Sequence, residues 1–177
     1  EPVYDQNIFQ ADFLYLTHWH FDHVHPQSLV RFDKSCVVLV PKFPVSSLPD
    51  QLRSLGFTRI QEVEHGRSVE LAPGFTLTSY QIQYQDDSIC VVDADNTILV
   101  DLNDAKPLPR TWKLLRRRHP RVDFMLRSHS PAWSYPSAYT FDDPSDAIPV
   151  DKQSYLKAFC AAARVLAPRH AVPFASS

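Results

Sequence analysis

No apolar stretch of the sequence approaches the roughly 20 residues that a membrane-spanning helix needs, and the opening residues show no signal-peptide pattern. We therefore expect a chain without a membrane span. An excess of charge is also missing, because 18 basic and 20 acidic residues leave a formal net charge of -2. This charge favours neither nucleic acid nor an anionic membrane, so a small molecule is the expected partner.

Cysteine is scarce, and its pattern argues against a disulfide framework. The sequence has 3 cysteines, an odd number, which lie far apart at Cys36, Cys90 and Cys160. Cys36 and Cys90 each precede a Val-Val pair, an apolar setting that is typical of a buried thiol. The sequence therefore predicts buried free thiols in a reducing compartment, the cytoplasm.

Glycine is also scarce, at 3 residues against 15 prolines. The chain begins only a short way before its main motif and ends on Ala-Ser-Ser directly after an apolar run. We expect from these features that the sequence is part of a longer protein. Its 177 residues, 44% of them hydrophobic, are enough for one buried core, so we predict a single domain over residues 1–177.

Short apolar or alternating runs predict most of the secondary structure, and turn residues such as Pro73-Gly74 and Asp95-Asn96 separate them. The run 75–84 alternates as a half-buried strand does. Strands are expected at 13–16, 36–40, 60–63, 68–71, 75–84, 88–92, 97–102, 122–126 and 171–174, and helices at 47–55, 111–118 and 153–166. Strands mixed with helices in this way indicate an α/β layered sandwich.

The segment Thr17–His23, with the sequence Thr-His-Trp-His-Phe-Asp-His, carries the strongest chemical signal. His18 and His20 would point the same way in an extended segment, so both could hold one ion. A turn after His20 would present Asp22 and His23 beside it. Imidazole and carboxylate together are typical ligands of zinc and iron. The segment therefore predicts a metal site.

This segment resembles the T-H-x-H-x-D-H signature of the metallo-β-lactamase superfamily. The resemblance implies an αββα sandwich with one or two divalent metal ions, His18 and His20 serving the first and Asp22 and His23 the second. It also implies an aspartate that bridges the two. Asp101 and Asp104 compete for that place, and we favour Asp104 because it lies beyond the strand end.

Other segments resemble particular branches of the superfamily. The helix ending at Gly56 and the turns at His65-Gly66 and Asp95-Asn96 resemble the lactonase-like and phospholipase D-like branch. Asn103-Asp104, together with residues 130–136, is similar to the lactamase-like half of CMP-N-acetylneuraminate hydroxylase. The third histidine of the family is missing from residues 80–87. A Gln or Asp replaces it, or residues are absent, or the first metal is weakly held.

His129 follows an apolar strand at the end where the loops of the site should gather, so it could donate a proton or bind developing negative charge. A surface histidine on a serine-rich loop is the alternative. Asp22 and His129 are thus the predicted catalytic residues. His25 is expected beside the ligands or in solvent. The arginines at 116–118 and 121 could touch phosphate, or simply cap a solvated helix end.

Three functions fit these residues. The first is a hydrolase that uses a metal-activated water, with zinc as the expected metal, on a small ester, lactone, amide or phosphodiester. The second is an iron-dependent oxygenase or hydroxylase on the same scaffold, which the missing third histidine favours because iron accepts carboxylate-rich ligation. The third is a metal-dependent nuclease. Manganese is an alternative metal for the hydrolase.

Overall fold

The computed structural model describes residues 6–129, 140, 142, 143, 145 and 152–174. The contacts divide the chain into two compact units, Glu1–Asn96 (the first unit) and Thr97–Ser177 (the second unit). Each unit is described by itself, and a single domain over 1–177 stays a prediction. Within the described residues, no helix combines the length and apolar character needed to cross a membrane.

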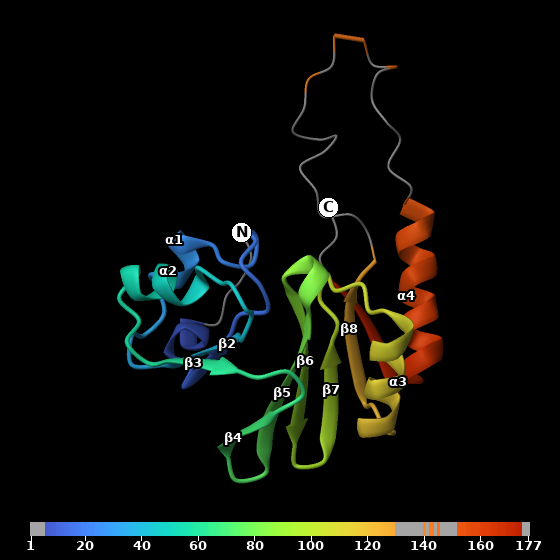
Figure 1. Cartoon of the computed structure of the whole chain (residues 1–177), viewed down its shortest axis with the longest axis horizontal. Coiled ribbons are helices and arrows are strands. Elements are labelled where there is room, and N and C mark those ends of the chain that lie inside the picture. Colours follow the sequence, from blue (N-terminus) through green and yellow to red (C-terminus); the bar gives the residue numbers. More distant parts are fainter. Residues whose placement is uncertain (1–5, 130–139, 141, 144, 146–151, 175–177) are drawn as a thin grey trace. The chain divides into compact units, whose positions relative to one another are not determined.

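From Gln6 onwards, the described part of the first unit contains two short helices, two 3-10 helices and six strands (Figure 1). In chain order these are η1 Gln6–Gln10, β1 Phe13–Tyr15, α1 Pro26–Leu29, β2 Val37–Pro41, α2 Leu48–Ser54, β3 Ile60–Val63, β4 Ser68–Ala72, β5 Phe75–Ile82, η2 Gln83–Gln85 and β6 Asp87–Ala94. Strands β1, β2 and β3 pair in parallel. Strands β4, β5 and β6 form an antiparallel meander.

Strand β2 is the centre of the first unit because it is buried on both faces. Val38 and Val40 point into a cluster that contains Leu48 and Leu52 of α2. Leu39, between them, points the other way into a cluster with β-strand residues such as Leu77 of β5. Successive side chains of a strand face opposite sides. The parallel sheet therefore lies between a helical layer and the antiparallel strands.

The second unit is a parallel sheet with helical crossovers (Figure 1). Its elements are β7 Thr97–Asp101, α3 Pro109–Arg118, β8 Phe124–Ser128, α4 Lys152–Leu166 and β9 His170–Phe174. Strand β8 pairs in parallel with β7 and with β9. Helix α4 packs against β8 and also contacts α3. Because parallel strands need long crossovers, both helices lie between consecutive strands in the chain.

The predicted elements are all present, with shifted ends at some of them. Helix α2 ends as expected, with Gly56 at a φ of +90° just beyond it. The turn residues Asp95 and Asn96 both adopt left-handed backbone, at φ 49° and 65°. The 3 cysteines form no disulfide bond, as predicted, but only Cys36 and Cys90 are buried and Cys160 is half-buried.

The prediction of a half-buried, alternating strand over 75–84 was wrong. Strand β5 ends at Ile82, and every residue from Leu77 to Ile82 is buried. Its polar side chains make hydrogen bonds inside the protein, such as the bond between Thr78 Oγ1 and Ser68 Oγ at 2.7 Å. Gln81 Nε2 likewise donates to the Val63 carbonyl at 2.6 Å. Polar residues at alternate positions therefore did not mean exposure to solvent.

The strand predicted at 122–126 begins two residues later, at Phe124. The carboxylate of Asp123 accepts the backbone N–H of Ile98 at 3.0 Å and the Arg121 guanidinium at 2.9 Å. Asp123 thus fixes the entry to β8 through its side chain as well as its backbone, whose N–H donates to the Ile98 carbonyl at 2.8 Å. The bonds to its carboxylate hold the pKa of its carboxyl below the ordinary value, the Ile98 N–H contributing most.

Candidate metal centre

The histidine motif begins where β1 ends, and its backbone turns at His20. Leu16 N donates to the Leu39 carbonyl at 3.1 Å, which extends the parallel contact up to the motif. The His20 carbonyl then accepts the N–H groups of His23 at 2.9 Å and Val24 at 2.7 Å. The turn predicted after His20 is confirmed, and it brings His23 back towards His18.

Three imidazole rings gather at this turn. The His18 ring centroid lies 4.5 Å from that of His20 and 4.2 Å from that of His23. His18 and His23 each offer a ligand atom, and these atoms lie within 4.8 Å of one another. His18 is buried, His23 half-buried and His20 exposed. The cluster therefore has one fixed, buried ring and two rings nearer to solvent.

His18 is held by a carboxylate from another strand. Its Nδ1 lies 3.3 Å from Asp87 Oδ1, at the start of β6, and 3.0 Å from Thr17 Oγ1. Asp87 Oδ1 also accepts the N–H of Ser88 at 2.6 Å, so the carboxylate is itself fixed. The second ring nitrogen of His18, Nε2, is buried and makes no hydrogen bond in the described part of the chain.

A chain of hydroxyl groups ties the start of the motif to the antiparallel strands. Ser88 Oγ donates to the Thr17 carbonyl at 2.7 Å, which uses its only proton. Tyr15 OH therefore donates to Ser88 Oγ at 2.8 Å and accepts from Ser79 Oγ at 2.7 Å. Burial, above all, raises the pKa of the Tyr15 hydroxyl, so it stays protonated.

Asp22 and His25 complete the surroundings of the motif. Asp22 is exposed, with Oδ2 3.4 Å from His23 Nε2. His25 Nδ1 bonds Ser28 Oγ at 3.0 Å at the start of α1. Asp22 thus stands beside the ring cluster, whereas His25 serves the local helix.

These residues fit a metal ion. A metal-ligating histidine commonly gives its other ring nitrogen to a carboxylate, which sets the tautomer and orients the ring. His18 and Asp87 show this relationship. The neighbouring donors are imidazole nitrogen and carboxylate oxygen, which zinc and iron both accept.

Asp101 and Asp104, the two candidates for the bridging aspartate, lie in the second unit, at and just beyond the carboxyl end of β7. Asp101 Oδ1 accepts the N–H of Asn103 at 2.9 Å, and Asn103 has a left-handed φ of 50°. Asp101 therefore closes the turn after β7, a structural role. Asp104 lies beyond that turn and raises the pKa of Tyr155 through its charge, second in effect to burial.

His129 follows the carboxyl end of β8, as the sequence predicted, and its Nδ1 is buried without a hydrogen bond in the described residues. Its catalytic role stays a prediction. His170 begins β9 and stacks on Phe124, with ring centroids 5.0 Å apart, at the opposite end of the strands. Residues 130–136, which carry part of one family resemblance, lie outside the described residues.

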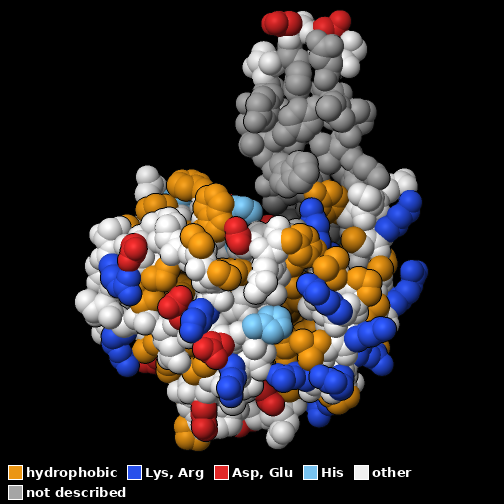
Figure 2. Space-filling view, in the orientation of Figure 1, with side chains coloured by type: hydrophobic (Ala, Val, Ile, Leu, Met, Phe, Trp, Pro, Cys, Tyr) orange, Lys and Arg blue, Asp and Glu red, His pale blue; other side chains and the backbone are white. Residues whose placement is uncertain are grey.

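The arginine cluster is partly used within the second unit. Arg116 Nη1 donates to the Val165 carbonyl at 2.7 Å. Arg121 pairs with Asp123 at 2.9 Å. Figure 2 shows basic side chains spread over the surface where α3 and α4 lie in Figure 1. These contacts account for two of the cluster's arginines without a phosphate partner.

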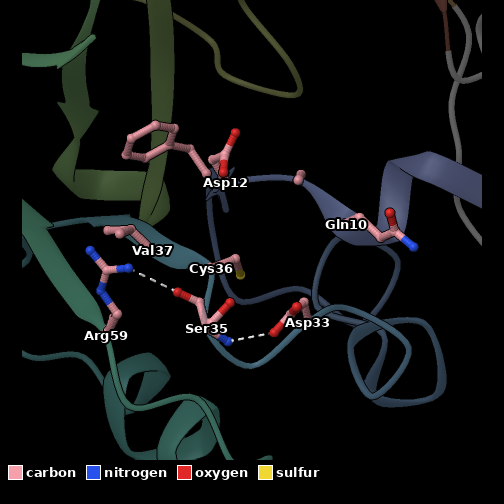
Figure 3. A pocket seen from close by; sticks show the side chains of 9 residues that line it. Gln10, Asp12, Asp33, Ser35, Cys36, Val37 and Arg59 are labelled. Atoms are coloured by element: carbon pink, nitrogen blue, oxygen red, sulfur yellow. Dashed lines mark hydrogen bonds between the residues drawn. The ribbon is translucent and has the colours of Figure 1, made fainter.

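A cavity of about 370 Å³ in the first unit lies away from the motif (Figure 3). Phe13 and Val37, which line it, begin β1 and β2, whereas the motif follows the end of β1. Arg59 Nη1 donates to the Ser35 carbonyl at 3.1 Å, and Asp33 Oδ1 accepts the Ser35 N–H at 2.8 Å. The charged side chains of this cavity, Arg59 and Asp33, are therefore used to hold the backbone of the loop at Ser35.

Sequence reasoning missed Asp87 as a functional residue. Asp87 lies in the stretch 80–87, where the third histidine of the family was expected and a Gln or Asp was considered as its replacement. That local signal could have identified Asp87. Its contact with Nδ1 of His18 could not be inferred, because Asp87 begins β6 whereas His18 follows β1, a strand of a different sheet.

No family model matches the chain. A putative Rieske 2Fe-2S iron-sulfur protein of Mycobacterium tuberculosis H37Rv is 31% identical over 139 residues, which are 73% of this chain. The chain spans 27% of the length of that relative. A namesake from Mycolicibacterium smegmatis is 32% identical over 141 residues, with 73% of this chain and 26% of that protein covered.

Solved structures resemble the chain at low sequence identity. An isothiocyanate hydrolase from Delia radicum gut bacteria matches 98% of this chain and 66% of its own, at a TM-score of 0.66 and 16% identity. The metallo-beta-lactamase fold protein YhfI of Bacillus subtilis matches 90% of this chain and 62% of its own, at a TM-score of 0.56 and 13% identity. Zn(2+)-bound PqqB of Methylobacterium extorquens matches 67% of this chain and 46% of its own, at a TM-score of 0.50 and 15% identity. The chain is therefore an α/β protein of the metallo-β-lactamase fold.

Proposed function

We propose that this chain is a metal-dependent hydrolase that acts on a small ester, lactone, amide or phosphodiester. The observation that carries the proposal is the gathering of His20 and His23 around a buried His18 whose ring is fixed by Asp87. Structural neighbours that are hydrolases by name support it.

We assign His18, His20 and His23 as metal ligands, with Asp22 beside His23 as a further ligand or as a proton acceptor. Asp104 is the proposed bridging aspartate, on the family pattern and because Asp101 is occupied in its turn. A divalent ion held there supplies Lewis acidity and lowers the pKa of water. Asp87 contributes by keeping one tautomer and one orientation of His18.

Zinc is the proposed metal, which the zinc-bound neighbour of the same fold supports. An iron-dependent oxygenase is the second candidate, favoured by relatives that are iron-sulfur proteins by name. A Rieske centre takes two cysteines and two histidines, and no cysteine of this chain stands near a histidine in the sequence. Iron in this chain would therefore be bound by the histidine motif. The arginine contacts within the second unit leave the nuclease least supported.

Elemental analysis of freshly purified protein separates these candidates. Zinc or manganese, with hydrolysis of model esters or phosphodiesters, is the expected result. Iron with a visible absorption band would instead favour the oxygenase. The double variant His18→Ala, His20→Ala should lose the metal and the activity together. Full metal occupancy in that variant would refute the assignment.

A further inference from the structure

Arg127 is a buried cation near the carboxyl end of β8. Strand β8 is the middle strand of the second unit's parallel sheet, between β7 and β9. Only 9% of Arg127 is exposed. Its Nη1 makes no hydrogen bond within the described residues. Burying a guanidinium group is unfavourable unless an anion or hydrogen-bond acceptor compensates it. This position therefore has capacity for a ligand.

His129 lies two residues further along the chain, the spacing that places two side chains on one face of an extended segment. Its Nδ1 is also buried without a hydrogen bond in the described part of the chain. Two polar side chains, each with a nitrogen atom that makes no hydrogen bond to a described residue, thus lie two positions apart in the chain where β8 ends. Ligands of open α/β sheets bind at the carboxyl ends of parallel strands, which is where these two side chains lie.

Among the described residues, the carboxylate of Asp104 compensates the charge of Arg127 in part. Burial lowers the pKa of its guanidinium, and the negative charge of Asp104 opposes this effect without overcoming it. A guanidinium group remains charged in proteins all the same. An additional anion at this place would therefore be attracted by a positive charge that has little water around it.

We propose that Arg127 and His129 bind an anionic oxygen group of the substrate, a carboxylate or a phosphate. The planar guanidinium suits either group because it presents parallel N–H donors to two oxygens. Calling the anion part of the substrate rests on the hydrolase proposed above. The binding itself depends on residues of the second unit and needs no metal.

The test titrates the metal-free full chain with inorganic phosphate and with acetate, and follows the ring signals of His129 by NMR. Saturable shifts are expected with at least one anion, and the stronger of the two identifies the group. Arg127→Met should weaken the binding at least about tenfold, the loss of a charged hydrogen bond. Arg127→Lys should retain part of it, since the charge remains without the fork of donors.

Two further measurements keep the outcome decisive. The exposed Arg117→Met serves as the control and should bind both anions as the wild type does. Arg127→Met should also keep or raise the midpoint of thermal unfolding, because a buried charge that is compensated only in part is removed. Equal anion affinity in wild type and Arg127→Met would overturn the proposal, as would a large fall in that midpoint. If the protein bound no metal, the proposed hydrolase function would be refuted, whereas the anion binding by Arg127 and His129 would not be affected.

Discussion

The carboxylate of Asp87 lies 3.3 Å from Nδ1 of His18, and both side chains are buried. The contact joins the end of β1 to the start of β6, so one ring of the motif is placed by a different sheet. His20 and His23, by contrast, are placed by the local turn. In the proposed centre, Asp87 of β6 therefore positions the ligand His18, whereas the turn of the loop positions the ligands His20 and His23.

Asp87→Asn should reduce metal affinity by roughly 10- to 100-fold, the usual effect of losing a carboxylate that orients a ligand histidine. The amide keeps the shape of the side chain and can still accept the Ser88 N–H, so the fold should persist. Competition with a chelator measures the affinity. Asp86→Asn, a change at the exposed neighbour whose φ of 51° suits asparagine, should leave the affinity unchanged. Equal affinities in the two variants would remove Asp87 from the centre.

The histidine motif could be predicted from sequence because its geometry is local: a short strand, then a turn at His20. The fold class could be predicted as well, because the order of strands and helices along the chain depends on local sequence patterns. The role of Asp87 and the burial of β5 depend on contacts between segments far apart in the chain. Arg127 follows an apolar run like any surface arginine, and only its neighbours in space bury it.

Tyr15→Phe should lower the free energy of unfolding by about 1–3 kcal/mol, because Ser79 and Ser88 are buried and would each lose a hydrogen-bond partner. Urea denaturation measures this change. Tyr84→Phe, at an exposed tyrosine, should change the free energy much less. If both variants are equally stable, the hydroxyl chain does not support the motif.

Asp104→Ala should remove more metal than Asp101→Ala does, as metal content after dialysis will show. Asp101 accepts the Asn103 N–H, so its replacement should mainly lower thermal stability. The reverse ranking of metal loss would transfer the bridging role to Asp101.

Asp123 should make stability depend on pH in the acid range. Hydrogen bonds from Ile98 and then Arg121 lower the pKa of its carboxyl from the ordinary 3.8. A lowered carboxyl pKa adds stability that is fully present above pH 3.8 and is lost as the pH falls through the lower, folded-state value. The difference in unfolding free energy between wild type and Asp123→Asn should therefore shrink below pH 3.8. Urea titrations across this range measure it, with the exposed Asp50→Asn as control. A difference that stays constant with pH would contradict the explanation.

X-ray absorption spectroscopy of the zinc-loaded protein tests the histidine centre most directly. The account predicts imidazole scattering with Zn–N distances of about 2.0–2.1 Å, a signal that weakens in His18→Ala and persists in His25→Ala. Zinc that washes out on dialysis, or a spectrum with oxygen ligands alone, would contradict it.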